Sequence, residues 1–425
     1  MDFRIASLML LLHISGSLTL NHISVNCKDV CAQRESDVQL NCIYNNIHTK
    51  TAFWFSEKQS KNWRKINQPE DLTLDSDYAG RVKQVISKYE ANLSISDVRK
   101  TDSGDYQLMF MEDGVNHLSS AAVSLTVTDT QVRINPVYTD PRNERVELTC
   151  ETSCDLTSRP QQYYWKKNNI QNSNVDHTTR IITVSHKDAD SYSCFLTPYL
   201  RSSSSSVCFE SGCWDVTYSS RRVCALVGST VDISCTYSHP SGHTVNKTFW
   251  HYGPSGAFKD LREERQFAGR VEYVGNKLRI KDLKISDSGV YEFITITDLK
   301  QYAATPGVIL TVTDTHIKIR PNLVSKRQDL ALICSTKCTL NDKHAYIWYK
   351  DGQVTDGFTK ANKLYLDSFS KEELQHYSCA VEDPVDSTAF SHYIVTLLVF
   401  LPQFLIIAAL WMWFFIRMHR ISKPN

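Results

Sequence analysis

Cysteine is the residue type in this chain with the widest scope for chemistry. The 425-residue sequence contains 13 cysteines, and a thiol can form a disulfide, bind a metal or act as a nucleophile. Two Cys-x3-Cys spacings occur, at Cys150/Cys154 and Cys334/Cys338. Neither is accompanied by a second ligand pair of suitable spacing, so we do not expect zinc. This cysteine content is typical of an oxidising compartment, and the odd number leaves at least one thiol free or paired with another chain.

Residues for other kinds of catalysis form no recognisable constellation. The 14 histidines are scattered without metal-ligand or triad spacing. The sequence has no glycine-rich phosphate loop and no nucleophile elbow. The 47 basic and 46 acidic side chains nearly cancel, which gives no long-range attraction to nucleic acid. We therefore expect a binding protein without a cofactor and without a nucleic-acid partner, not an enzyme.

Two hydrophobic segments bracket all the cysteines. Residues 1–17 have the layout of a signal peptide. Residues 393–416 carry no formal charge and are long enough to cross a bilayer as one helix. The basic residues that follow favour the cytoplasmic side. The sequence thus predicts a single-pass type I plasma-membrane protein with an extracellular N-terminus. Its short tail, residues 417–425, lacks tyrosine, so we expect no autonomous signalling.

The segment between them is an internal repeat. Val-Thr-Asp-Thr occurs at 127–130 and at 312–315, and Gly-Arg-Val occurs at 80–82 and at 269–271. The shift is about 185–195 residues, which indicates a duplicated two-domain module.

Each half contains two copies of one further pattern. A cysteine is followed 12–15 residues later by a tryptophan, and an acidic residue precedes a tyrosine near the end. The Cys/Trp pairs are Cys42/Trp54, Cys150/Trp165, Cys235/Trp250 and Cys334/Trp348, and the tyrosines are Tyr106, Tyr192, Tyr291 and Tyr377. This pattern is typical of immunoglobulin-like sandwiches. We predict an all-β chain of four tandem immunoglobulin-like β-sandwiches in the order V-C2-V-C2, followed by one transmembrane α-helix. The expected domains are residues 18–128 (V), 129–210 (C2), 211–313 (V) and 314–391 (C2).

The core cysteine pairs differ between the domain types. The C2-type domains have complete pairs, Cys150 with Cys194 and Cys334 with Cys379. In the V-type domains Leu108 and Phe293 stand where the second cysteine would be, so Cys42 and Cys235 lack their usual partner. Cys208 and Cys213 are close enough in sequence to pair locally. Two salt bridges, Arg81–Asp102 and Arg270–Asp287, are expected to close the V-type sandwiches.

The region between the hydrophobic segments resembles the sialic-acid-binding immunoglobulin-like lectins (siglecs) and their B-cell co-receptor-like relatives. The resemblance rests on Cys-Ala-Leu-Val-Gly-Ser-Thr-Val-Asp-Ile-Ser-Cys at 224–235, on Val-Thr-Asp-Thr, on Cys-x3-Cys and on Ile-Trp-Tyr-Lys-Asp-Gly at 347–352. In that family the first cysteine bonds to a middle strand, near Ala91 and Asn276 here, and neither residue is cysteine. A further family disulfide ties the first domain to the second.

That family disulfide implies the bonds Cys31–Cys154 and Cys224–Cys338. The alternative is pairing across a hairpin, Cys31–Cys42 and Cys224–Cys235. Cys27, Cys42 and Cys235 receive no assigned partner from the resemblance.

The resemblance also implies where an arginine that binds sialic acid would stand in this sequence. A siglec grips the carboxylate of sialic acid with one arginine, because a planar guanidinium meets a carboxylate bidentately. The matching positions here are Met109 and Ile294, so the resemblance implies that this mechanism is lost. Met109, Phe110 and Met111 lie beside the loops at one end of the first domain and are the candidate ligand contacts.

Two glycosylation sequons begin at Asn92 and Asn246. The leading hypothesis is an immune receptor or adhesion molecule that binds a protein or glycoprotein on a cell surface, with a disulfide-linked or cis dimer as a further option. The alternatives are a glycan-binding lectin that uses a different site and a shed or decoy ectodomain.

Overall fold

The structure is a computed structural model, and it divides the chain into two compact units. The first is Met1–Asn341 with Ala361–Gln375, and the second is Asp342–Lys360 with His376–Asn425. The structure describes residues 24–45, 51–65, 68–112, 115–136, 145–157, 162–168, 170–171, 179–185, 190–197, 203–209, 213–253, 258–298, 301–303, 305–321, 330–340, 344–359, 362–366, 370 and 372–382.

The predicted signal peptide, span and tail (1–17, 393–416 and 417–425) lie outside those ranges. Among the described residues, no helix combines the length and the apolar character needed to cross a membrane.

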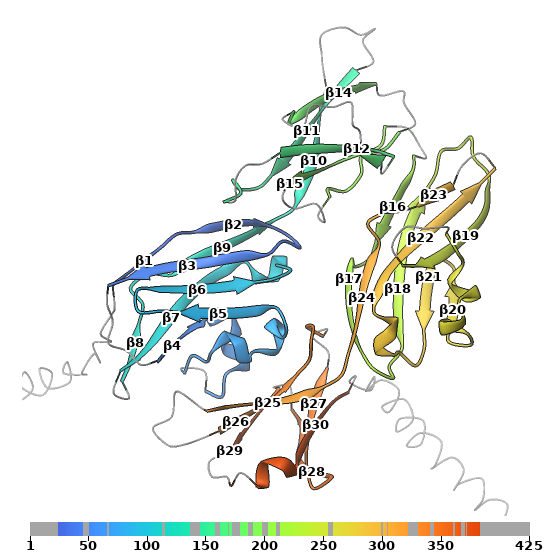
Figure 1. Cartoon of the computed structure of the whole chain (residues 1–425). Coiled ribbons are helices and arrows are strands. Elements are labelled where there is room, and N and C mark those ends of the chain that lie inside the picture. Colours follow the sequence, from blue (N-terminus) through green and yellow to red (C-terminus); the bar gives the residue numbers. More distant parts are fainter. Residues whose placement is uncertain are drawn as a thin grey trace, which may run out of the picture. The chain divides into compact units, whose positions relative to one another are not determined.

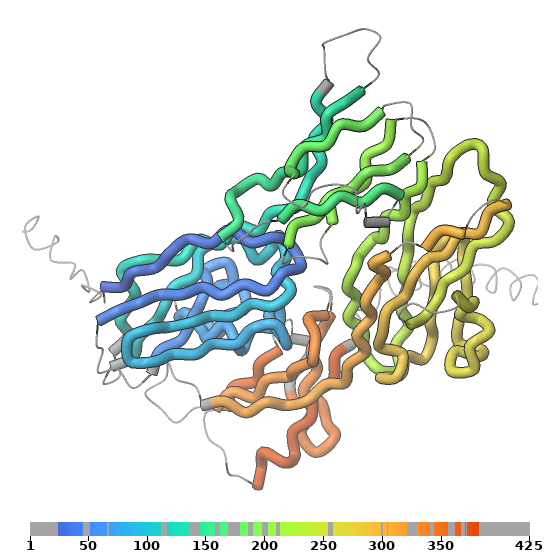
Figure 2. The backbone as a smooth tube through the Cα atoms, turned by 45° about the horizontal axis from the view of Figure 1, so that its top comes forward, coloured from blue at the N-terminus to red at the C-terminus, as the bar shows by residue number. Residues whose placement is uncertain are grey.

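The first sandwich of unit 1 consists of two sheets (Figures 1 and 2). One apolar core lies between them. One sheet has the order β1 (Val25–Cys27), β3 (Val38–Tyr44), β6 (Glu90–Ile95) and β5 (Val82–Ile86). The other has the order β2 (Val30–Gln33), β9 (Val123–Thr128), β7 (Gly104–Glu112) and β4 (Thr51–Phe55), with β8 (Val115–Leu118) beside β7. Short 3-10 turns complete it: η1 (Glu57–Asn62), η2 (Leu72–Leu74), η3 (Ser76–Tyr78) and η4 (Lys100–Asp102).

Period-two alternation explains why these segments form a half-buried sheet. In β3, Leu40, Cys42 and Tyr44 are buried, and the residues between them face outward. Successive side chains of a strand point to opposite faces, so this pattern places one face of the sheet on the core.

The second sandwich is smaller. Its sheets have the orders β10 (Thr130–Pro136), β11 (Arg145–Thr152), β14 (Ile181–Ser185) and β13 (Ile170–Gln171), β12 (Gln162–Lys167), β15 (Tyr192–Thr197). Its core holds Trp165 against the disulfide-bonded Cys150 and Cys194.

The third sandwich repeats the strand order of the first. One sheet is β16 (Asp215–Tyr218), β18 (Val231–Ser238), β21 (Lys277–Ile280), β20 (Val271–Val274). The other is β17 (Arg222–Leu226), β24 (Val308–Thr313), β22 (Gly289–Thr297), β19 (Val245–Tyr252), with β23 (Gln301–Ala303) on β22. Its 3-10 turns are η5 (Leu261–Glu263), η6 (Arg265–Phe267) and η7 (Ile285–Asp287). This equivalence is the structural form of the duplication seen in the sequence.

Two further three-stranded sheets follow. Unit 1 contains β25 (His316–Pro321), β26 (Leu330–Ser335) and β29 (Lys363–Leu366), in that order. Unit 2 contains β28 (Gln353–Thr359), β27 (Ala345–Lys350) and β30 (Tyr377–Glu382), and η8 (Glu373–His376) precedes β30. The part of the chain that the structure describes is therefore all-β, with several immunoglobulin-like domains.

Candidate binding site

Disulfides cross-link the strands and segments that would carry a binding surface. The structure joins Cys31 to Cys154 and Cys224 to Cys338, the pairings implied by the resemblance. It also joins Cys150 to Cys194 and Cys208 to Cys213. Cys334 and Cys379 are both disulfide-bonded. Cys235 is a free thiol buried in the third core, so it is not placed to link a second chain.

The bond that the sequence analysis did not assign joins Cys27 to Cys42. These two residues are directly opposed on β1 and β3, and Ala91 of β6 lies on the other side of Cys42. Cys27, on the edge strand β1, is thus the partner of Cys42 within this sheet. In siglecs the partner comes from a middle strand, on the side of Cys42 where Ala91 lies here. The hairpin alternative Cys31–Cys42 is wrong, because β2, which carries Cys31, pairs with β9 in the other sheet.

The third sandwich lacks that bond for an identifiable reason. Tyr218 is the residue opposite Cys235, at the position that Cys27 occupies in the first sandwich. Its ring is buried, and its hydroxyl accepts a hydrogen bond from the Phe293 amide at 2.9 Å. A tyrosine therefore fills the space of a cysteine partner, and the hairpin alternative Cys224–Cys235 is also wrong, since Cys224 bonds to Cys338.

The first and third sandwiches are each attached to the segment that follows them. Beside the Cys31–Cys154 bond, the Cys31 amide donates to the Thr157 hydroxyl at 2.8 Å, and the Thr157 amide donates to the Cys31 carbonyl at 3.1 Å. In the second copy the Lys337 amide donates to the Thr313 hydroxyl at 3.0 Å. A covalent bond combined with hydrogen bonds at the same junction restricts bending there.

The two salt bridges expected from the sequence are present. Arg81 lies 2.8 Å from Asp102, and Arg270 lies 2.7 Å from Asp287, measured from guanidinium nitrogen to carboxylate oxygen. Both carboxylates are buried, so these pairs stabilise the sandwiches and do not present charge to a ligand.

The candidate ligand contacts of the first sandwich fall on both sides of β7. Phe110 is fully buried in the core, edge-on to Tyr44 at 5.2 Å between ring centroids. It is therefore unavailable to a ligand, and its selection as a contact was wrong. Met109 points the other way but is only 5% exposed, and Met111 is partly exposed.

Met109 belongs to a second apolar cluster on the outer face of this sheet. The cluster consists of Phe53 and Phe55 of β4 with Met109, and Trp63, Met111 and Leu118 pack against it while remaining partly exposed. We call these six residues the outer cluster. The equivalent position in the third sandwich is also apolar and buried. It is occupied by Ile294 of β22, which is fully buried and lies opposite Phe249 of β19.

At the two positions that correspond to the siglec arginine, the first and third sandwiches carry buried apolar side chains. No arginine lies on β7 or β22, and the residues at the critical positions are Met109 and Ile294. A buried carboxylate without a cationic partner is strongly unfavourable. The outer cluster instead suits an apolar protein surface.

The opposite sheet of the first sandwich presents Asn92. Its side-chain oxygen accepts from Gln39 at 2.9 Å and from Asn41 at 2.8 Å, and its side-chain nitrogen donates to Glu90 at 2.8 Å. Ile43 and Val85, 58% and 55% exposed, lie on the same outward face. The second sequon residue, Asn246, is exposed where the pairing of β19 with β22 shifts register.

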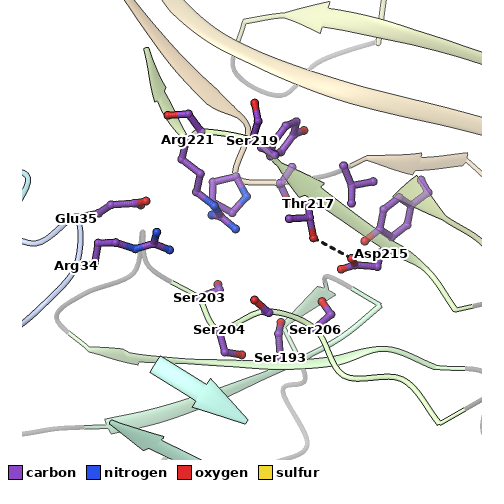
Figure 3. A pocket seen from close by; sticks show the side chains of 17 residues that line it. Arg34, Glu35, Ser193, Ser203, Ser204, Ser206, Asp215, Thr217, Ser219 and Arg221 are labelled. Carbon is purple, nitrogen blue, oxygen red and sulfur yellow. Dashed lines mark hydrogen bonds between the residues drawn. The ribbon is translucent and has the colours of Figure 1, made fainter. Parts of the chain in front are cut away.

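A polar cavity of about 130 Å³ is lined by residues of the first, second and third sandwiches, all within unit 1 (Figure 3). Arg34 and Glu35 reach it from the turn after β2, Arg221 from the turn after β16, and Ser203–Ser206 from the second sandwich. Burial raises the pKa of Glu35, while Arg221 and Arg34 oppose that rise.

Next to this cavity, the Lys166 ammonium donates to the Ser203 hydroxyl at 3.1 Å. Burial and the nearby Arg221 lower the Lys166 pKa to about 8. Because carboxylates and cations both line the cavity, it does not select one sign of charge, and we assign it no ligand. Within the described ranges, no group of three or more His, Cys, Asp or Glu side chains is arranged to hold a metal ion.

The first sandwich matches a known family. Residues 32–130 match the family model described as B-cell receptor CD22-like, first Ig-like. The match runs from β2 to the start of β10 and so covers the first sandwich alone.

Solved structures that resemble the chain are also multi-domain immunoglobulin proteins. The I-band fragment I67–I69 of titin is 14% identical, with a TM-score of 0.24, and the match covers 69% of this chain and 97% of that one. The four N-terminal immunoglobulin domains of Dscam1 isoform 6.9 are 16% identical, with a TM-score of 0.21, covering 86% and 97%. The mouse nectin-like molecule 4 ectodomain is 14% identical, with a TM-score of 0.20, covering 67% and 98%. Similarity at this level carries no functional argument.

Proposed function

We propose that the chain is a plasma-membrane receptor or adhesion protein whose first sandwich binds a protein counter-receptor through the outer face of the β4-β7-β8 sheet. One observation carries this proposal: Met109, at the position of the siglec arginine, is buried in an apolar cluster. The match of residues 32–130 to a CD22-like first domain supports an immune role.

The outer cluster has the composition of a protein-binding surface. Aromatic residues and methionine are enriched at the centres of protein interfaces, where a few buried anchors supply most of the affinity. Trp63, Met111 and Leu118 are partly exposed over the buried Phe53 and Phe55, so a partner can cover them without displacing the core.

The other sheet is the less suitable face. A glycan on Asn92 would extend from the surface that carries Ile43 and Val85 and would shield it. The β4-β7-β8 sheet carries neither sequon, so it remains free to bind. Anchoring would come from residues 393–416.

The test is adhesion of cells that express the full chain to a panel of leukocytes and endothelial cells. Each target would be tested untreated, after sialidase and after protease. We expect protease to abolish adhesion and sialidase to leave it intact. Loss after sialidase would refute the proposal in favour of a lectin with a different site, and no adhesion to any target would favour a decoy.

A matched pair of substitutions tests which sheet of the first sandwich binds the counter-receptor. Met111→Glu puts a charge at the margin of the outer cluster and is expected to weaken adhesion at least about tenfold, the size of a moderate hot-spot loss. Val85→Glu puts the same charge on the opposite sheet and should have no effect. Equal losses in the two variants would show that the β4-β7-β8 face is not the site.

A further inference from the structure

A second surface of the first sandwich faces residues far along the chain, all within the first compact unit. The Lys363 ammonium of β29 forms an ion pair with the Glu70 carboxylate, although the two residues are 293 positions apart. The Tyr365 hydroxyl donates to the other Glu70 oxygen at 2.6 Å. The Arg64 guanidinium lies 4.7 Å from the centre of the Tyr365 ring.

Further contacts extend this surface toward β5. The Arg81 guanidinium donates to the Thr339 hydroxyl at 3.2 Å, and that hydroxyl donates to the Ala79 carbonyl at 3.1 Å. Gly80 has φ +73°, and a Cβ atom placed on it would lie 2.1 Å from the Lys337 carbonyl oxygen. The two backbones approach so closely that only glycine fits.

The burial of Lys363 indicates that this contact belongs to the folded state. Its side chain is 2% exposed and that of Glu70 is 12% exposed. Lysine is almost never fully buried unless it is paired, and separating such a pair leaves an uncompensated charge. Lys363 and Glu70 come from different segments of the chain, so contact between these segments neutralises both buried charges.

We infer that the first sandwich packs on a later segment of unit 1 through this contact, which we call the clasp: residues 64–81 of the first sandwich against residues 337–339 and 363–365. The partner of this surface is a segment of the same chain. Arg64 directly follows Trp63 of the outer cluster, so the clasp lies beside the proposed ligand face and is distinct from it.

The experiment measures how fast an N-hydroxysuccinimide ester acetylates Lys363 in the full chain on cells. Lys281 of the third sandwich, whose side chain is 55% exposed, is the reference within the same molecule. Clasp closure predicts that Lys363 reacts at least about tenfold more slowly than Lys281, since burial restricts access to locally opened states. Similar rates for the two lysines would overturn the inference.

A pair of glycine substitutions distinguishes disruption of the clasp from the backbone strain that a side chain causes at any glycine with positive φ. Gly80 and Gly269 occupy the same Gly-Arg-Val position in the two V-type sandwiches, with φ values of +73° and +75°. An added Cβ meets Lys337 at Gly80 but meets nothing within 4 Å at Gly269. Gly80→Ala should raise the Lys363 rate to that of Lys281, whereas Gly269→Ala should leave it slow. Lys363 remaining slow in Gly80→Ala, or becoming fast in both variants, would contradict the clasp.

Varying the density of the protein on the cell surface distinguishes a clasp within one chain from a contact between two chains. An intramolecular clasp protects Lys363 equally at high and at tenfold lower expression. Protection that disappears on dilution would show that a second copy supplies Glu70, and would overturn closure within one chain. Glu70→Gln, which removes the charge and keeps the size, should also accelerate acetylation of Lys363.

Discussion

Replacing both Cys27 and Cys42 with alanine tests what the disulfide within the first sheet contributes. The two cysteines are 15 residues apart in sequence, and Cys42 is 1% exposed in the core. Closing a loop of this length in the unfolded chain stabilises the folded state by about 3 kcal/mol. Removing a buried sulfur adds a packing loss of about 1 kcal/mol.

The third sandwich provides the control. Cys235 occupies the position equivalent to Cys42, is also buried, and forms no disulfide. Cys235→Ala therefore removes sulfur packing without removing a cross-link, and should cost only about 1 kcal/mol. The difference between the two perturbations isolates the cross-link.

Hydrogen exchange of the whole chain, read peptide by peptide, measures both effects. Every 1.4 kcal/mol is a tenfold change in an equilibrium constant, so the cross-link alone predicts exchange about a hundredfold faster in β3 and β6. Cys235→Ala should accelerate exchange in β18 and β21 only several-fold. If the two variants change exchange by the same factor, the loop-entropy reasoning is refuted and packing accounts for the whole effect.

Three further predictions concern the third sandwich. Tyr218→Cys should form a disulfide with Cys235, detectable by peptide mapping, but should not stabilise the domain, because losing the buried ring offsets the roughly 3 kcal/mol from the cross-link. Arg270→Ala leaves the fully buried Asp287 without its cation and should cost about 3–5 kcal/mol, whereas Arg279→Ala, in a solvent-exposed pair, should cost far less; equal losses of exchange protection would contradict this. Burial raises the pKa of Cys235 to about 12, so the thiol stays protonated at pH 8 and should resist iodoacetamide until urea unfolds the chain; rapid labelling of native protein would disprove its burial.

The strands and their inward faces follow from local patterns in the sequence. Two-residue alternation decides which side chains reach the core, and it also assigns β7 correctly. Counting from Tyr106, the residues Leu108 and Phe110 point inward, and Met109 and Met111 point outward. Applied strictly, the same alternation would have excluded Phe110 as a ligand contact.

Features that depend on which strands become neighbours are harder to derive. The Cys27–Cys42 bond requires knowing that β1 pairs with β3 while β2, a few residues later, joins the other sheet. The only local signal was an unassigned cysteine shortly before the first core cysteine. The ion pair of Glu70 with Lys363 has no local signal, because it depends on how segments 293 residues apart come together.

The two junction disulfides also determine how the chain carries mechanical load. Tension applied at its two ends passes covalently from Cys31 to Cys154 and from Cys224 to Cys338. The intervening stretches, with sequence separations of 123 and 114 residues, lie in closed loops outside that path. Pulling the ends apart therefore does not draw out the residues inside either loop. Because Cys150–Cys194 and Cys208–Cys213 close further loops, the extensible length under tension at the two ends lies mainly between Cys194 and Cys208, between Cys213 and Cys224, and beyond Cys338.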